Sequence, residues 1–297
     1  MKKVHSYAIA ALGIISLAAC NNDETATVST PECITVQANI GALTKVQTTG
    51  NTAEFETGDT ISLYAWTGSS ESVPDTKVVN GVRNGLGADG KWTPKTQMLW
   101  ADMVSKHYFI GIYPARTVTD FTADSYTLDP TEYEASDLLI ATSLNGIKAT
   151  NDPVSLIFDH VLAKLNVNLT FRNQWETTPT VTAVEVTAKK TGSVNYLSKT
   201  LTASDSETPS GIALTKASDA SWSGLQVPQT GVRTITIKID GKDYVFTHTD
   251  DIPLAGGQYT TVNLIVGRDQ IEMGTMSINN WKEGTTIDNG EAQTDED

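Results

Sequence analysis

Three glycines in the first half of the chain have the spacing of a dinucleotide-binding turn. Gly85, Gly87 and Gly90 satisfy G-x-G-x-x-G. That motif binds phosphate only where a strand leads in and a helix follows, because the phosphate sits on the amino terminus of the helix. Here Pro94 and β-forming residues come next, so no helix is expected. The segment 85–90 predicts a hairpin turn, and no cofactor is expected.

Residues suited to acid–base or metal chemistry are scattered. None of the four histidines opens the H-E-x-x-H pattern of a zinc helix: His5, His107, His160 and His248. His160 follows Asp159, but neighbours on a strand point to opposite faces, which favours a structural histidine. The pair Asp250-Asp251 lacks the ligand spacing of a calcium loop. We therefore expect no catalytic residue and no metal, and a protein that is not an enzyme.

The tryptophans suggest an alternative, because their rings can stack on sugars. They are dispersed along the chain beside apolar or turn residues, which favours packing in a core or at sheet edges: Trp66, Trp92, Trp100, Trp175, Trp222 and Trp281. A surface glycan-binding lipoprotein of a nutrient-uptake system stays open as the alternative function. Exposed, coplanar Trp or Tyr rings on one face would favour it.

One residue has a covalent chemistry that its context predicts. Leu17-Ala18-Ala19-Cys20 follows an apolar run and resembles the lipobox of bacterial lipoproteins, in which the cysteine is acylated and becomes the first residue. Residues 1–19 are therefore expected to be a signal peptide, too short for a stable membrane span. Palmitate and further acyl chains on Cys20 would give durable membrane attachment.

The residues after Cys20 are polar and predict a flexible lipidated tether over 20–33. The acidic pair Asp23-Glu24 resembles an export signal of surface lipoproteins. The expected location is thus the outer face of the cell outer membrane. The formal net charge of −14 excludes a nucleic-acid binder, which needs a basic face to replace counterions around phosphate.

The rest of the chain has the pattern of β-strands. The segment Val161–Phe171 alternates apolar and mostly polar residues, which predicts one buried and one wet face. Shorter alternating segments are Ile61–Ala65, Val184–Val186, Ile235–Ile239 and Val262–Val266. Five turn pairs separate such segments: Asn80-Gly81, Asp89-Gly90, Asn145-Gly146, Asp240-Gly241 and Gly256-Gly257. Short strands with turns between them predict an all-β sandwich fold.

The 297 residues suffice for two such sandwiches. The predicted division lies in the turn-rich stretch Asn145–Pro153. It gives an N-terminal sandwich over 34–150, a C-terminal sandwich over 151–288 and a polar, acidic tail over 289–297.

Four segments, in one order, resemble the fimbrillin family, the Mfa-like pilins and related lipoproteins of the Bacteroidia. They are Phe55–Leu63, Ala88–Trp100, Pro153–Leu165, and Leu254–Tyr259 followed by Ile278–Trp281. The first contains F-x-x-G-D-x-I and the third contains F-x-H-x-L-A-K-L. The resemblance implies two tandem transthyretin-like β-sandwiches and export as a lipoprotein. It also implies assembly into type V pili and a role in cell adhesion. The implied partners are other pilus subunits or copies of the chain. A host or bacterial surface is a further possible ligand.

Donor-strand exchange is the assembly mechanism that the resemblance implies. A subunit loses its first strand to proteolysis, and an extended segment of a neighbour fills the groove. The replaceable strand is expected within Ile34–Val46, where Ile34, Val36, Ala38 and Ile40 alternate. The donor is expected within Gln270–Ile287.

The chain departs from the shaft pilins, which are cut early by an Arg-specific protease. It has five arginines, of which Arg83 is the first, so Lys45 is the candidate cleavage site. Tip and anchor roles therefore stay open beside a shaft role.

Overall fold

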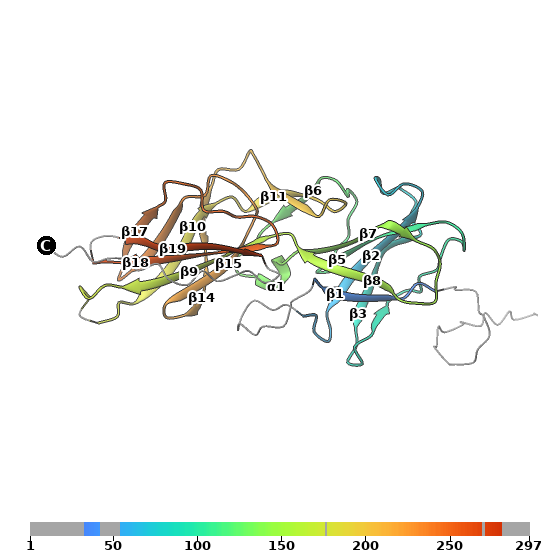
Figure 1. Ribbon diagram of the computed structural model, residues 1–297, viewed down its shortest axis with the longest axis horizontal. Helices are drawn as coiled ribbons and strands as arrows, with labels where there is room; N and C mark the ends of the chain where they lie inside the picture. The colour runs from blue at the N-terminus through green and yellow to red at the C-terminus, as the bar shows by residue number, and fades with distance from the viewer. Residues whose placement is uncertain (1–32, 42–53, 176, 269–270, 281–297) are drawn as a thin grey trace, which may run out of the picture.

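The computed structural model describes residues 33–41, 54–175, 177–268 and 271–280. Cys20 and Lys45 lie outside them, as do the expected signal peptide and acidic tail. The described chain forms strands β1 to β19 and one short helix, α1 (Tyr133–Ser136). Figure 1 shows an elongated molecule, with the early strands at one end and the late strands at the other.

The N-terminal half is built on one seven-stranded sheet. Its strands, in spatial order, are β1 (Val36–Ile40), β8 (Val154–His160), β7 (Leu139–Ile147), β5 (His107–Tyr113), β2 (Thr60–Thr67), β3 (Val79–Leu86) and β4 (Trp92–Pro94). All neighbours are antiparallel except β1 and β8, which run parallel. β1 and β4 are therefore the two edges of this sheet.

The C-terminal half holds three smaller sheets. The five-stranded sheet has the order β14 (Thr215–Ser218), β15 (Ser221–Gln226), β9 (Ala163–Phe171), β18 (Gln258–Val266) and β19 (Ile271–Asn280). The four-stranded sheet has the order β13 (Ser210–Ala213), β10 (Val181–Ala188), β16 (Thr234–Ile239) and β17 (Lys242–Thr247). The three-stranded sheet has the order β12 (Thr200–Ala203), β11 (Thr191–Asn195) and β6 (Asp124–Thr127).

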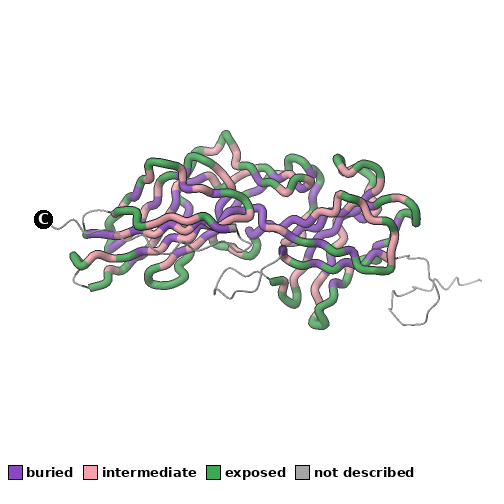
Figure 2. Tube along the Cα trace, in the orientation of Figure 1, coloured by how far each residue is buried: buried purple, intermediate pink, exposed green. Residues whose placement is uncertain are grey.

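Two apolar clusters form the core. The smaller one packs on one face of the seven-stranded sheet and includes Ile61, Leu63 and Phe109. The larger one begins on the opposite face of that sheet, at Tyr64 and Trp66, and continues through the C-terminal half. β2 is thus buried on both faces, although the sequence predicted only one. Figure 2 shows buried segments running along the interior of both halves.

The all-β, sandwich-like fold expected from the sequence is confirmed. In β9, Leu165, Val167 and Leu169 point into the core, while Asn166 and Asn168 are partly exposed. The inward residues of β10, β16 and β18 alternate as expected. An apolar face that must leave water fixes the register of each strand, because a slip by one residue would turn that face outward.

Two of the five expected turns are wrong. Asn80-Gly81 lies inside β3 and Asn145-Gly146 lies inside β7, in each case beside a shift of register with the neighbouring strand. Gly81 and Gly146 have positive φ, which a bulge needs as much as a tight turn does. Asp240-Gly241 does join β16 to β17 as a hairpin, with φ of 49° and 78°.

The division into two tandem domains stays a prediction. β8 follows the expected boundary at 150/151, yet it pairs with β1 and β7 in the sheet of the N-terminal half. β6 precedes that boundary, yet it pairs with β11 in the C-terminal half. Among the described residues, no helix is long and apolar enough to cross a membrane.

Candidate assembly edge

β1 lies at the edge of the seven-stranded sheet and pairs with only one of the described strands. Val36 is aligned with Val154 and Ile40 with Phe158, in a parallel register (Figure 1). Among the described residues no strand pairs with the opposite side of β1, although β4 lies close to it and Trp92 of β4 donates its indole N–H to the Ala38 carbonyl. An edge of this kind can accept another strand.

The inward face of β1 is apolar, and its outward face is polar. Ile34, which precedes the strand, is 1% exposed, Val36 is 5% exposed and Ala38 is 6% exposed. Ile40 is partly buried against the same cluster. Gln37 and Asn39 are exposed. Ile34, Val36, Ala38 and Ile40 therefore lie on one side of the segment and pack on the smaller core cluster. These are the alternating residues predicted for a replaceable strand.

Bulky side chains from distant strands form the floor under β1. Phe158 of β8, Trp92 of β4 and Phe55 belong to or pack against the smaller cluster. The Phe55 ring meets Trp92 and Phe158 edge to face, with centroids 5.1 and 5.3 Å apart. Removal of β1 would expose this apolar floor to water, at a cost of roughly 25 cal/mol for each Å².

Few polar contacts other than the β1–β8 ladder hold this segment. The backbone N–H of Ile34 donates to the Met98 carbonyl at 2.8 Å. The indole N–H of Trp92 donates to the Ala38 carbonyl at 3.3 Å. The backbone N–H of Gly41 donates to the Phe158 carbonyl at 2.8 Å. The inward apolar face, rather than side-chain charge, therefore dominates the attachment of β1.

The expected donor segment also lies at a sheet edge. Its described part, Ile271–Asn280, forms β19, which pairs antiparallel with β18 along its length. Met273 and Ile278 are 38% and 50% exposed. In this arrangement β19 would have to leave β18 before it could fill a neighbour's groove. The remaining residues of the expected segment, Gln270 and 281–287, lie outside the described chain.

The sequence model of the fimbrillin-like family matches residues 44–281. The chain belongs to that family. No curated protein matches it in sequence.

Solved structures share the fold of this fimbrillin at low sequence identity. A candidate cell adhesion protein from Bacteroides uniformis is 15% identical, with a TM-score of 0.64 over 84% of this chain and 98% of that chain. Another from Bacteroides ovatus is 13% identical, with a TM-score of 0.67 over 86% and 100%. A fimbrial protein from Bacteroides vulgatus is 15% identical, with a TM-score of 0.52 over 84% and 99%.

The residues considered above as candidates for catalysis or cofactor binding make structural contacts in this fimbrillin. His160 Nδ1 donates to Asp137 Oδ1 at 2.9 Å, and both residues are buried. Asp159 accepts from Lys199 Nζ at 2.6 Å instead. Gly85, Gly87 and Gly90 lie in and beside the hairpin that joins β3 to β4. No cluster of three His, Cys, Asp or Glu residues able to hold a metal occurs in the described part of the chain.

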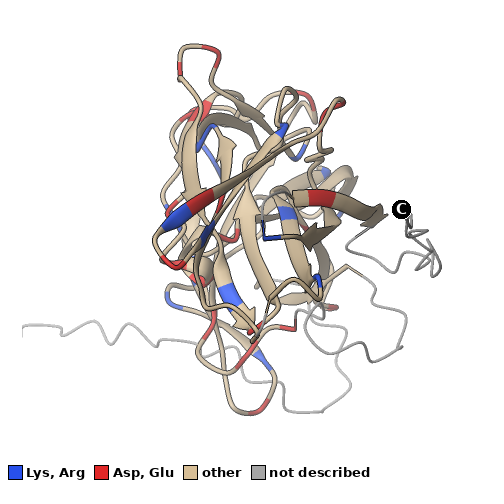
Figure 3. Ribbon diagram, turned by 90° about the vertical axis from the view of Figure 1, so that its left-hand side faces the viewer, with Lys and Arg blue, Asp and Glu red and all other residues tan. Residues whose placement is uncertain are grey.

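Four of the five described tryptophans are core residues: Trp66, Trp92, Trp100 and Trp222. Trp175 is half-buried between Phe171 and Tyr244 and donates its indole N–H to the Val266 carbonyl at 3.1 Å. The described tryptophans therefore form no exposed, coplanar platform for a sugar. Blue segments are separated in Figure 3 and form no continuous basic face on the side shown.

The sequence reading missed the loop that joins β4 to β5. His107 is fully buried and hydrogen-bonds two residues of this loop. Backbone N–H groups of Ser105 and Val104 donate to Asp102, which lowers the pKa of its carboxyl to about 2. The signal was present in the sequence, because Leu99, Met103 and Val104 are apolar residues that fit no strand alternation.

Proposed function

We propose that the protein is a fimbrial subunit, held at the outer membrane by lipid on Cys20 and assembled through exchange of β1. Family membership and the fold shared with fimbrial and candidate adhesion proteins support the subunit role. The observation that carries the assembly step is the edge position of β1, with Val36 and Ala38 buried over an apolar floor. Its partners are other subunits or copies of itself.

Sheet completion is the physical driver of the proposed exchange. A strand from a neighbour would restore the main-chain hydrogen bonds of β8 and place alternate side chains over Phe158 and Trp92. No cofactor and no catalytic residue are required. The proposal is limited to the chain after cleavage, because uncleaved β1 occupies the edge.

Cleavage at Lys45 tests the exchange. Limited trypsin treatment of the mature chain, followed by size analysis at high concentration, is expected to give polymers. A Lys45→Gln variant treated in the same way is the matched control and should stay monomeric. A wild-type chain that is cut at Lys45 and remains monomeric for days would leave β1 as a permanent edge strand.

The lipid anchor has a separate test. Metabolic labelling with a radioactive fatty acid should mark the wild-type chain and spare Cys20→Ala, which should also leave the membrane fraction. Equal labelling of the two chains would rule out acylation at Cys20.

A further inference from the structure

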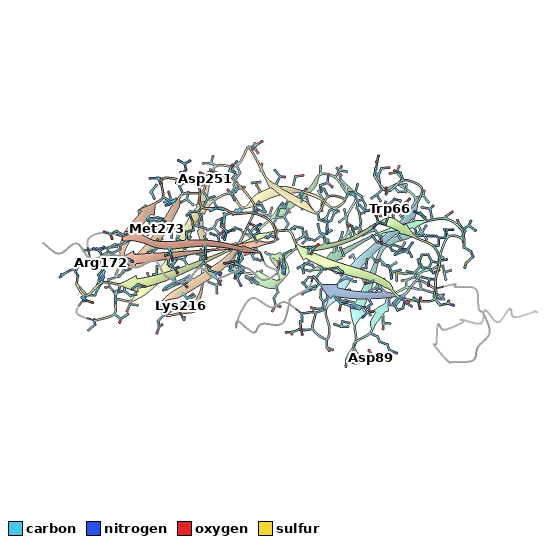
Figure 4. All side chains as sticks on the ribbon, viewed as in Figure 1. Trp66, Asp89, Arg172, Lys216, Asp251 and Met273 are labelled. Atoms are coloured by element: carbon cyan, nitrogen blue, oxygen red, sulfur yellow. The ribbon has the colours of Figure 1, made fainter. Side chains whose placement is uncertain are left out.

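The outward face of the five-stranded sheet carries an array of uncharged polar side chains. Two rows of residues that pair across all five strands consist of Ser, Thr and Asn alone. The first row is Ser218, Ser221, Asn168, Asn263 and Thr275. The second row is Thr215, Ser223, Asn166, Thr261 and Ser277. We name these ten residues the polar array, and all of them are partly or fully exposed. The array reaches from β14 to β19, the two edge strands of the sheet, on which Figure 4 labels Lys216 and Met273.

Hydrogen bonds between side chains run across the first row of the polar array. Ser221 Oγ donates to Asn168 Oδ1 at 2.9 Å, and Asn168 Nδ2 donates to Asn263 Oδ1 at 2.9 Å. Asn263 Nδ2 in turn donates to Thr275 Oγ1 at 2.6 Å. Each amide nitrogen has a second N–H and each amide oxygen a second lone pair, so both can still bond outward. Because the bonds hold these side chains in place, a ligand would immobilise few of them on binding.

The polar array carries no charge, although the whole chain has a formal net charge of −14. The adjoining rows contain Lys164 on one side and Glu272 on the other. Lys164 is only 8% exposed, and Glu272 is paired with Arg172. The array therefore offers neither the cations that a nucleic acid or an anionic lipid requires nor the carboxylates that a metal ion requires.

A protein partner is a poor match for the polar array. Protein interfaces bury an apolar core in which aromatic residues and Met are enriched, and the array has no such residue. The exposed Met273 and Ile278 of β19 lie outside it. Covering hydroxyl and amide groups costs free energy unless each of them regains a hydrogen bond. A ligand that brings a dense set of its own hydroxyls avoids this cost.

Two tyrosines border the polar array at the end nearer the N-terminal half. Tyr259 lies two residues before Thr261 on β18, on the same face, and is aligned with Lys164. Tyr133 of α1 packs on the same lysine, whose Nζ lies 5.9 Å from the centroid of its ring. Both tyrosines are partly exposed. Aromatic rings that lie beside hydroxyl and amide groups suit a sugar, because one surface of a sugar ring is apolar C–H and its rim is hydroxyl.

We propose that the polar array binds a neutral polysaccharide. The hydroxyls of such a ligand each donate and accept, as the hydroxyl and amide side chains of the array do, and none of them brings a charge to the acidic surface. A sheet face open from edge to edge suits an extended polymer better than a single sugar. Each contact would be weak, and copies repeated along a fimbria would strengthen it by multivalency. The inference adds a ligand to the proposed subunit role, and it requires neither exchange of β1 nor lipid on Cys20.

The test titrates the mature chain with three neutral polysaccharides, namely a mannan, a β-glucan and a starch dextrin, and with anionic hyaluronan. Nitrogen-15 NMR should show that the side-chain amides of Asn168 and Asn263 shift with at least one neutral polysaccharide and not with hyaluronan. Affinity gel electrophoresis should show the same binding at low and high salt, because no charge is involved. The double variant Asn168→Ala/Asn263→Ala should bind about tenfold more weakly, since two hydrogen-bonding groups are lost. Thr236→Ala, on the outward face of β16 in the four-stranded sheet, is the matched control and should bind as the wild type does.

An absence of shifts at Asn168 and Asn263 with all three neutral polysaccharides would overturn the proposal. Equal binding by the wild type and a folded double variant would do the same, because the ligand would then lie elsewhere. Shifts that appear without polysaccharide and grow with protein concentration would identify a second copy as the occupant. If the double variant fails to fold, Ser277→Ala decides, since it leaves the hydrogen bonds of the first row intact and should still weaken binding. A chain that forms polymers after cleavage at Lys45 but binds no polysaccharide refutes the array alone, and the converse result refutes strand exchange alone.

Discussion

Single residues of β9 decide whether the C-terminal core can form. Leu165 is fully buried in the larger cluster, so Leu165→Asp would bury an unpaired carboxylate at a cost on the order of several kcal/mol, comparable with the stability of a domain. Asn166 points the other way and makes only a 3.4 Å contact with Thr261. Asn166→Asp should therefore change stability by about 0.5 kcal/mol or less. Thermal melts of both variants check this, and a similar loss in the two would contradict the assigned faces.

Asp102 gives a second prediction for a single residue, in its response to pH. The pKa of its carboxyl is lowered to about 2 by the N–H of Ser105 first, and then by the Ser105 side chain and the N–H of Val104. A lowered folded-state pKa means that the loop bonds are fully present above about pH 4 and are lost as the pH falls through about 2. Carbon-13 NMR should show this titration. Ser105→Ala should raise the pKa part of the way to its usual value. Titration near 4 in the wild type would contradict the capping.

A whole element, β1, should be removable without unfolding the rest of the molecule. Val36→Asp places a charge on the buried face of the strand, and Gln37→Asp places the same charge on its exposed face. Because β8 is the only described strand that pairs with β1, we expect Val36→Asp to speed amide exchange in β8 at least tenfold and leave β16 unchanged. Gln37→Asp should alter neither. Global unfolding of Val36→Asp would make β1 an integral part of the core rather than a replaceable strand.

Apolar–polar alternation along the chain predicts the strands better than it predicts which residues pack against them. It gives the inward residues of β9, β16 and β18, since each strand has one wet face. It underestimates β2, because the second layer over Tyr64 comes from Val118 and Phe121, which lie in a stretch without such a pattern. It also shows the apolar face of β1 but not its floor. Trp92 and Phe158 come from strands far along the chain, and the parallel pairing with β8 is a product of tertiary packing.

At the scale of the whole molecule, each half contains a strand that comes from the other side of the boundary predicted at 150/151. A fragment of 34–150 lacks β8, so β1 would lose its partner strand. A fragment of 151–288 lacks β6 and the residues near Val118 and Phe121 that close the larger core. His160 would also lose its buried partner Asp137, which lies on the other side of the cut. We therefore expect neither fragment to melt cooperatively as a monomer, and we expect the two fragments to recover a cooperative melt when expressed together. A cooperative, monomeric 151–288 fragment would show instead that the C-terminal sandwich folds on its own and that the contacts of β6 are dispensable.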